Sequence, residues 1–78
     1  MTQNLKYTVG ASGSGWGVWD SNGNKIASFT SRSIGRYEAL RYMYHLYGWD
    51  WNRSKYVRNE PWLRDLKIWE GYGLNMAN

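Results

Sequence analysis

The sequence lacks cysteine entirely, and its 78 residues include only one histidine and one proline. Without cysteine the chain forms no disulfides and has no thiolate ligands for zinc or iron–sulfur clusters. The single histidine, His45, cannot assemble a zinc site alone, because catalytic zinc takes three protein ligands and structural zinc four. We therefore expect no metal and no other cofactor. The absence of cysteine also suits a reducing cytoplasm.

Long apolar runs are missing as well. None approaches the roughly 20 residues of a membrane-spanning helix. The first residues, Met-Thr-Gln-Asn-Leu-Lys, contain no apolar signal-peptide segment. We expect a cytoplasmic protein that has no membrane partner. The six carboxylates are scattered through the sequence, with no sign of a catalytic pair. We accordingly expect a protein that is not an enzyme.

Aromatic side chains and positive charge are what the sequence has in excess. Six Trp, seven Tyr and one Phe occur in a chain of net charge +4. At this length we expect residues 1–78 to form a single domain with a small core. Rings can supply much of the apolar area of such a core, but these are too many to bury completely. Some Trp and Tyr should lie at the surface, where they favour interfaces, and the charge suits an anionic partner.

A β-hairpin is predicted where two apolar runs, Trp16–Asp20 and Lys25–Thr30, flank Asn22-Gly23. This dipeptide is typical of a two-residue type I′ turn. Such a turn sets four cross-strand pairs: Trp16 with Phe29, Val18 with Ala27, Trp19 with Ile26, and Asp20 with Lys25. Because side chains alternate between faces, one face should pack in the core and the other should carry Trp19 and Ile26. The residues of the core face are Trp16, Val18, Ala27 and Phe29.

A first strand is predicted at Leu5–Val9, where apolar and polar residues alternate. The Gly- and Ser-rich residues 10–15 predict a flexible loop. That loop does not fit a phosphate-binding P-loop, because Trp16 and Gly17 follow where Lys and Ser or Thr would be needed. The fold class expected is α+β, with a three-stranded antiparallel sheet packed on one main helix.

The main helix is expected to follow Ser33, its N-cap, and to end near Tyr47, with Gly48 as the left-handed residue after it. Ser31 and Gly35 are alternative N-caps. One helical stripe should pack on the sheet, and it comprises Ala39, Leu40, Met43, Leu46 and Tyr47. A second stripe should point away from the core, and it comprises Tyr37, Arg41 and Tyr44.

The C-terminal part is predicted to be an aromatic element. Residues 49–58 have no clear period and should form an ordered loop. From Glu60 onward the spacing of apolar residues predicts a helix, with a strand at residues 66–69 as the alternative. We expect this element to pack on the sheet or the helix. We also expect it to cover Trp19 and Ile26 through Trp62, Leu66 or Trp69.

The candidate binding site combines basic and aromatic residues of the middle of the chain. Its members are Arg36, Tyr37, Arg41, Tyr44, Trp51, Arg53, Lys55 and Arg58. Arg mixed with Tyr and Trp is typical of phosphate contacts with base stacking, and equally of protein–protein hot spots. A third interpretation is a solvated helix face whose Arg stems lie over Tyr rings. His45 shares a helix edge with Glu38 and Tyr42, and we interpret it as a surface or half-buried side chain.

Part of the chain resembles a known class of domain. The features are a strand, a Gly-rich loop, Trp16-Gly17-Val18-Trp19, the Asn22-Gly23 turn, Phe29, a polar cap and Glu38-Ala39-Leu40. Together they resemble the AP2-type and integrase arm-binding DNA-recognition domains, over roughly residues 5–48. The resemblance implies that the exposed sheet face enters the major groove with Arg and Trp. Here that face would carry no Arg, and its residues are Lys6, Thr8, Trp19 and Ile26.

By size and by its lack of motifs, the chain is also similar to small phage-encoded accessory proteins, including inhibitors of host defence such as anti-CRISPRs. Two functions are therefore expected. The first is a small non-catalytic module that docks onto nucleic acid or a nucleoprotein complex through its Arg/Tyr/Trp surface. The alternative is an inhibitor or adaptor that caps a host protein.

Overall fold

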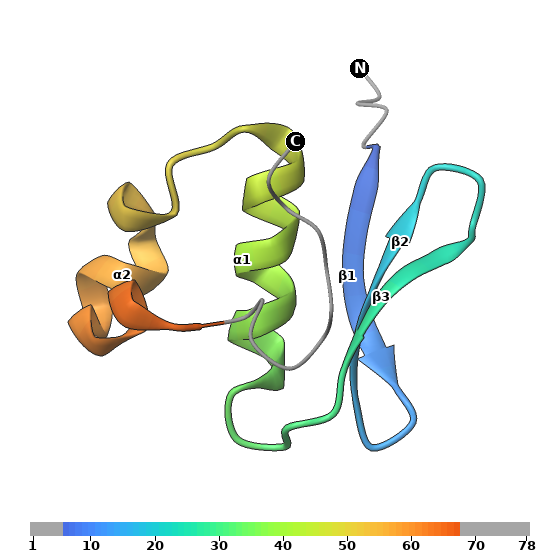
Figure 1. Ribbon diagram of the computed structural model, residues 1–78, viewed down its shortest axis with the longest axis horizontal. Coiled ribbons are helices and arrows are strands. Elements are labelled where there is room, and N and C mark those ends of the chain that lie inside the picture. The colour runs from blue at the N-terminus through green and yellow to red at the C-terminus, as the bar shows by residue number, and fades with distance from the viewer. Residues whose placement is uncertain (1–5, 68–78) are drawn as a thin grey trace.

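The computed structural model describes residues 6–67 and arranges them in three layers. A three-stranded antiparallel sheet in the order β1-β2-β3 forms one side, and helix α1 packs along it. Short helices form a third layer on the other side of α1 (Figure 1). The elements are β1 Tyr7–Ser12, β2 Gly15–Asp20, β3 Lys25–Phe29, α1 Gly35–Tyr47, η1 Trp51–Arg53, α2 Lys55–Asn59 and η2 Pro61–Asp65. The expected α+β class, a three-stranded sheet with one main helix, is confirmed.

The first strand is longer than predicted, because most of the Gly-rich segment belongs to the sheet. β1 continues through Ser12, which pairs with Gly15 of β2. Only Gly13 and Ser14 remain as the turn, so the flexible loop predicted over residues 10–15 is wrong. Gly13 has a φ of 58°, at the first central position where a type II′ turn requires glycine. Leu5, the predicted start of the strand, lies outside the described residues.

The hairpin between β2 and β3 has the predicted strands but a different turn. The Gly23 N–H donates to the Asp20 carbonyl at 3.1 Å, and Gly23 alone in this turn has a positive φ, of 86°. The Asp20 carboxylate accepts hydrogen bonds from the backbone of Asn22 and Asn24 at 2.9 and 3.0 Å. An Asp side chain that bonds its own turn in this way competes with the type I′ geometry. The two-residue turn predicted at Asn22-Gly23 is therefore wrong.

The longer turn changes the pairing only near the end of the hairpin. Trp19 pairs with Lys25 instead of Ile26, so the predicted Trp19–Ile26 and Asp20–Lys25 pairs do not form. A bulge between Val18 and Trp19 then restores the predicted register. Two predicted pairs are confirmed, Val18–Ala27 and Trp16–Phe29.

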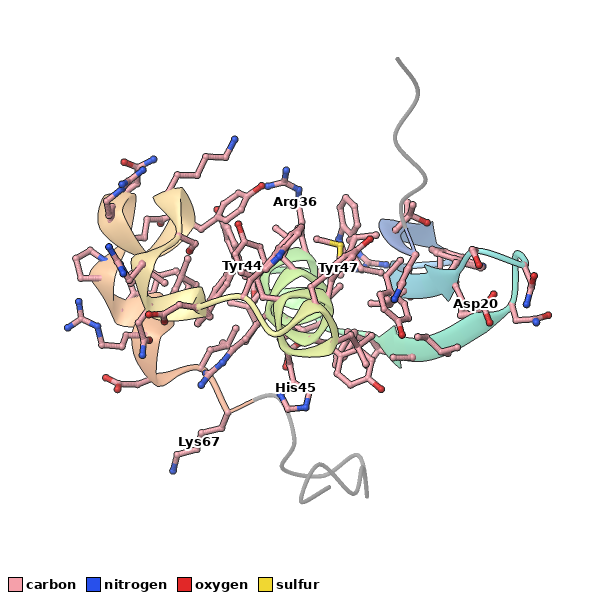
Figure 2. The ribbon with its side chains drawn as sticks, turned by 90° about the horizontal axis from the view of Figure 1, so that it is seen from above. Asp20, Arg36, Tyr44, His45, Tyr47 and Lys67 are labelled. Carbon is pink, nitrogen blue, oxygen red and sulfur yellow. The ribbon has the colours of Figure 1, made fainter. Side chains whose placement is uncertain are left out.

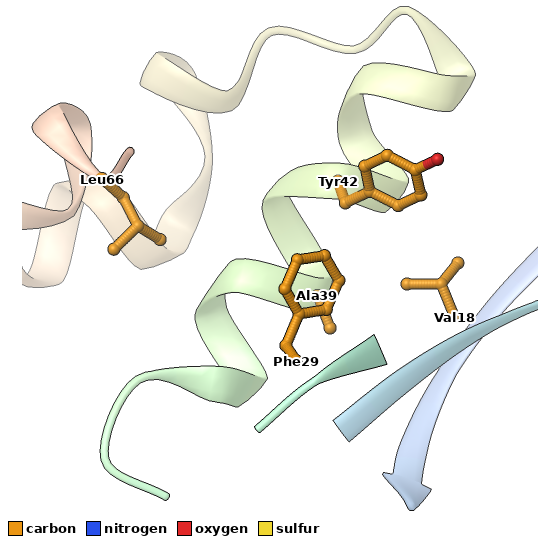
Figure 3. Packing of buried hydrophobic residues seen from close by; sticks show 5 residues of the cluster. All are labelled: Val18, Phe29, Ala39, Tyr42 and Leu66. Carbon is orange, nitrogen blue, oxygen red and sulfur yellow. The ribbon is translucent and has the colours of Figure 1, made fainter. Parts of the chain in front are cut away.

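The sheet and α1 enclose a first cluster of buried residues. It consists of Val18, Phe29, Ala39, Tyr42 and Leu66, and Trp16 packs against its edge. Figure 3 shows Val18, Phe29, Ala39 and Tyr42 between α1 and the sheet, and Leu66 joins this cluster from the segment that follows η2. The face predicted for the hairpin is therefore confirmed. The stripe predicted for the helix is right at Ala39 and Leu46, and at Tyr47, which contacts Tyr7 of β1, but it missed Tyr42.

A second cluster lies on the opposite side of α1. Its buried members are Leu40, Trp51, Val57 and Leu63, and Met43 packs against them. Leu40 and Met43, predicted to pack on the sheet, therefore belong instead to this second cluster, which meets the sheet only through Val9 among the described residues. The short helices of the third layer supply a second apolar surface, so α1 is covered on two sides. Trp51 fixes this layer by donating its indole N–H to the Leu63 carbonyl at 3.0 Å.

The ends of α1 agree only in part with the prediction. Gly48 follows the helix in the left-handed conformation, with a φ of 76°, as predicted. The N-cap is Ile34 rather than Ser33, and no side chain caps it. The Ser31 hydroxyl instead accepts from the Ile34 N–H at 3.2 Å, because residues 32–34 form a turn ahead of the helix.

The third layer is more helical than predicted, and it does not cover the outer face of the sheet. Residues 51–59 form η1 and α2 rather than a loop, and the helix predicted after Glu60 is a short 3-10 helix that ends at Asp65. Figure 1 places these elements across α1 from the sheet, so Trp62 and Leu66 do not cover Trp19 and Ile26. Trp69 lies outside the described residues.

The outer face of the sheet is covered locally by Trp19. A Cβ added at Gly17 would lie 3.0 Å from the Trp19 ring, and one added at Gly10 would lie 3.4 Å from it. The ring therefore lies across these two glycines on adjacent strands. Because glycine has no side chain, the Trp19 ring can pack directly on the two strands and become half-buried without a second layer above it.

Candidate binding surface

A continuous chain of ring contacts runs from the sheet, over α1, to the third layer. Seven contacts join eight rings, and centroid separations range from 4.2 to 6.3 Å. The rings, in spatial order, are Tyr7, Tyr47, Trp49, Tyr44, Trp51, Tyr56, Tyr37 and Trp62. Most neighbours meet edge to face, which suits the quadrupoles of the rings. The chain therefore orders aromatic side chains from three layers relative to one another.

Two cations lie against one ring of this chain. The Arg36 guanidinium carbon is 5.8 Å from the Tyr56 ring centroid, and the Lys55 Nζ is 5.4 Å from it. Arg36 comes from the first turn of α1 and Lys55 from the first residue of α2. Both side chains are exposed, and Tyr56 is half-buried. We call these three residues the Tyr56 patch.

The predicted site residues fall into three groups by exposure. Arg53 and Arg58 are exposed, as are Arg36 and Lys55. Two aromatic members, Tyr37 and Tyr44, are half-buried, as is Arg41. Trp51 is buried in the second cluster. The structure therefore brings Arg36 and Lys55 together, whereas it places Trp51 where its ring stabilises the fold.

The stripe of Tyr37, Arg41 and Tyr44 does not point away from the core, as the sequence predicted. Tyr37 and Tyr44 both pack against the second cluster. The Arg41 Nη1 is buried with no hydrogen-bond partner among the described residues. Burial lowers the pKa of Arg41, and the nearby Asp65 carboxylate opposes that change. The third layer covers this stripe because the residues that follow α1 fold back along it.

Tyr37 is hydrogen-bonded to the Glu60 carboxylate. Its hydroxyl donates to Glu60 Oε2 at 2.9 Å, across 23 residues of sequence. This hydrogen bond is the main reason that the pKa of Tyr37 is raised, and burial adds to it. Glu60 therefore has a fixed partner beside the Tyr56 patch, since Tyr56 also contacts the Tyr37 ring at 6.3 Å.

Trp49 is a surface feature that was not among the predicted site residues. The residue is 49 % exposed, and its ring stacks on Tyr47 with centroids 4.2 Å apart and planes 8° from parallel. The Trp49 N–H donates to the Tyr44 carbonyl at 2.9 Å, directly after the left-handed Gly48. The local signal for this arrangement was the Tyr-Gly-Trp sequence at a predicted helix end.

Arg36, Tyr44 and Tyr47 leave α1 on one side, and His45 leaves it on the opposite side (Figure 2). The Tyr56 patch and the ring beneath Trp49 are therefore anchored on the same side of the helix. His45 is exposed, which is one of the two placements that the sequence predicted for it.

Glu38 is the one buried acidic side chain among the described residues, at 8 % exposure. Its Oε1 is buried and has no hydrogen-bond partner within that part of the chain. Burial disfavours the charged form and so raises the pKa of Glu38 above its ordinary value. The folded state therefore holds this proton more strongly than the unfolded state does.

From this we expect Glu38 to favour the folded state in acid and to lose that contribution as the pH rises through its raised pKa. The free energy of unfolding of Glu38→Gln, relative to that of the wild type, should therefore increase by about 1 kcal/mol when the pH is raised from about 4 to about 7. Urea unfolding at both pH values measures this difference. The same difference at both pH values for Glu38→Gln would contradict the assignment.

Comparison with known proteins gives no matching family model, no matching curated protein and no matching solved structure. The resemblance to AP2-type domains therefore stays a prediction. Within residues 6–67, no helix is long and apolar enough to cross a bilayer. The same residues contain no group of three or more His, Cys, Asp or Glu that could hold a metal ion. The function of the surface must be inferred from its own residues.

Proposed function

We propose that the protein is a small nucleic-acid-binding module that docks through the Tyr56 patch. The observation that carries this proposal is the placement of Arg36 and Lys55, from two separate elements, against the ring of Tyr56. Two exposed cations beside a partly exposed ring form a combination suited to phosphate and base contacts.

The contact with a ring leaves these cations available to an anion. A carboxylate partner would neutralise the charge and occupy the N–H donors, whereas a ring attracts the cation through its quadrupole. The guanidinium of Arg36 and the ammonium of Lys55 keep their donors for phosphate oxygens. Holding the side chains against Tyr56 also reduces the conformational entropy that they would lose on binding.

Nearby carboxylates already have intramolecular partners. Glu60 accepts the hydrogen bond of Tyr37, and Asp50 accepts the Asn52 N–H at 3.0 Å as the cap of η1. Residues 51–67 carry five exposed cations against the exposed Asp65 and the half-buried Glu60, and the cations are Arg53, Lys55, Arg58, Arg64 and Lys67. This charge distribution favours an anionic partner and supports the proposal.

The test is the salt dependence of binding to labelled single-stranded and duplex DNA, measured by fluorescence anisotropy. We expect log K to fall with log salt with a slope of roughly −2 to −4, which corresponds to about three to five phosphate contacts. Arg36→Ala and Lys55→Ala should each weaken binding and reduce the slope by about 1. Lys25→Ala is the matched control, because it removes one exposed cation from the sheet, where Lys25 bonds the Ser12 hydroxyl at 2.9 Å.

Absence of binding to either DNA at low salt would overturn the proposal. In that case, a partner captured from lysate that survives nuclease treatment would support the alternative function, an inhibitor or adaptor that caps a host protein. Such binding should vary less with salt and depend on a few aromatic or Arg anchors, each worth about 2 kcal/mol or more.

A further inference from the structure

We infer that the nucleic acid bound is single-stranded and that Trp49 is the platform on which one of its bases stacks; this inference rests on the proposed function. Trp49 lies outside the Tyr56 patch, so its geometry is an independent observation. The inference also names a residue that carries no charge, and its effect is therefore separable from that of phosphate contacts.

The first step is the orientation of the Trp49 ring. Tyr47 stacks on it in parallel at 4.2 Å, so one face of the indole is covered. The residue is nevertheless 49 % exposed, so the parallel contact with Tyr47 leaves about half of its surface accessible. The two-ring stack therefore keeps exposed aromatic surface that a third planar ring can contact.

The second step is that the platform is fixed before a ligand arrives. Tyr44 meets Trp49 edge to face at 5.2 Å, and the backbone N–H of Trp49 donates to the Tyr44 carbonyl, which fixes the main chain that carries the ring. Tyr47 is held in turn, because its hydroxyl accepts from the Tyr7 N–H at 2.9 Å and donates to the Tyr7 carbonyl at 3.2 Å. A ring anchored in this way loses little entropy when a base stacks on it.

The third step is the relation of the platform to the cations. Arg36 and Tyr47 leave α1 on the same side, as Figure 2 shows. They are separated by three helical turns, or about 16 Å along the axis. A stacked strand rises about 3.4 Å per nucleotide, so about five nucleotides would reach from the platform to the Tyr56 patch.

A single strand fits these features better than a duplex does. In a duplex the faces of the bases are covered by their neighbours, so the exposed surface of Trp49 would have no base face to stack on. A duplex-binding mode through the sheet would need free basic side chains on its outer face. Over Gly10 and Gly17 that face carries the Trp19 ring and the stem of Lys25, whose Nζ already donates to the Ser12 hydroxyl.

The experiment measures binding of fluorescein-labelled dT10 and of a 10-base-pair duplex to the wild type and to Trp49→Leu at one low salt concentration. We expect the wild type to bind dT10 at least tenfold more tightly than the duplex. Trp49→Leu should weaken dT10 binding about 5- to 100-fold and leave duplex binding unchanged. Trp49→Tyr should restore most of the lost affinity, because it keeps an aromatic face.

Trp62→Leu is the matched control. Trp62 is 52 % exposed, but it meets Tyr37 edge to face at 6.1 Å, and no parallel ring among residues 6–67 lies against it. Its loss should change dT10 binding less than twofold. Thermal melting confirms that each variant is folded.

Equal binding of dT10 and duplex, or dT10 affinity unchanged in Trp49→Leu, would overturn the inference. If Arg36→Ala and Lys55→Ala still weakened binding in that case, the proposed function would stand without it. Absence of binding to both DNAs would instead remove the proposed function itself.

Discussion

Phe29→Ala is expected to lower the free energy of unfolding by about 3–5 kcal/mol, which would leave little of the stability of a typical small domain. Phe29 is 1 % exposed in the first cluster, where its ring meets Tyr42 at 5.9 Å. Removing the ring would leave a cavity between β3 and α1. The surrounding side chains cannot fill it without moving the helix toward the sheet. Urea unfolding followed by circular dichroism measures the loss.

The control is Ile26→Ala on the same strand. Ile26 is 37 % exposed and opposite no residue of β2, so its truncation should cost less than about 1 kcal/mol. A Phe29→Ala protein with an unchanged unfolding midpoint would show that β3 does not pack on α1 in this register.

Leu63→Ala is expected to lower the free energy of unfolding by about 2–5 kcal/mol, although Leu63 lies far from the sheet. Leu63 is fully buried in the second cluster, and its carbonyl accepts the Trp51 indole N–H. Loss of its side chain would leave a cavity among Leu40, Trp51 and Val57. Arg64→Ala, at the exposed neighbour in η2, should change stability by about 0.5 kcal/mol or less.

The same variant tests whether the third layer unfolds together with the sheet. Val9 and Tyr37 pack against both clusters, so the two cores share residues. We therefore expect one transition, with coincident midpoints from circular dichroism and tryptophan fluorescence. Two separate transitions, with only the fluorescence transition shifted in Leu63→Ala, would show that the third layer is an independent unit.

The sequence predicted which types of residue the candidate site contains, but not how they are arranged in space. The sequence identified Arg36 and Lys55 as members of a basic–aromatic set, but the set also contained Trp51, which the fold buries. It could not relate Arg36 to Lys55, because they are brought together by the return of the chain along α1. Trp49 was missed because its exposure and its parallel contact with Tyr47 depend on where the chain goes after Gly48.

The features that the sequence determined by itself are local ones. Alternation of apolar residues fixed the core face of the hairpin at Val18 and Phe29, because neighbouring side chains of a strand must point to opposite faces. Gly48 fixed the end of α1, since only glycine adopts a left-handed conformation without cost from a Cβ. These signals act over a few residues and need no knowledge of the rest of the chain.

The tertiary structure decided which faces of α1 are covered. The helix carries apolar and aromatic residues around most of its circumference, so its periodicity was compatible with more than one buried stripe. The third layer selected a second stripe by packing Leu63 and Trp51 against Leu40. Burial of a helix face depends on the partner that covers it. That partner is set by the path of a chain segment whose own sequence has no clear period.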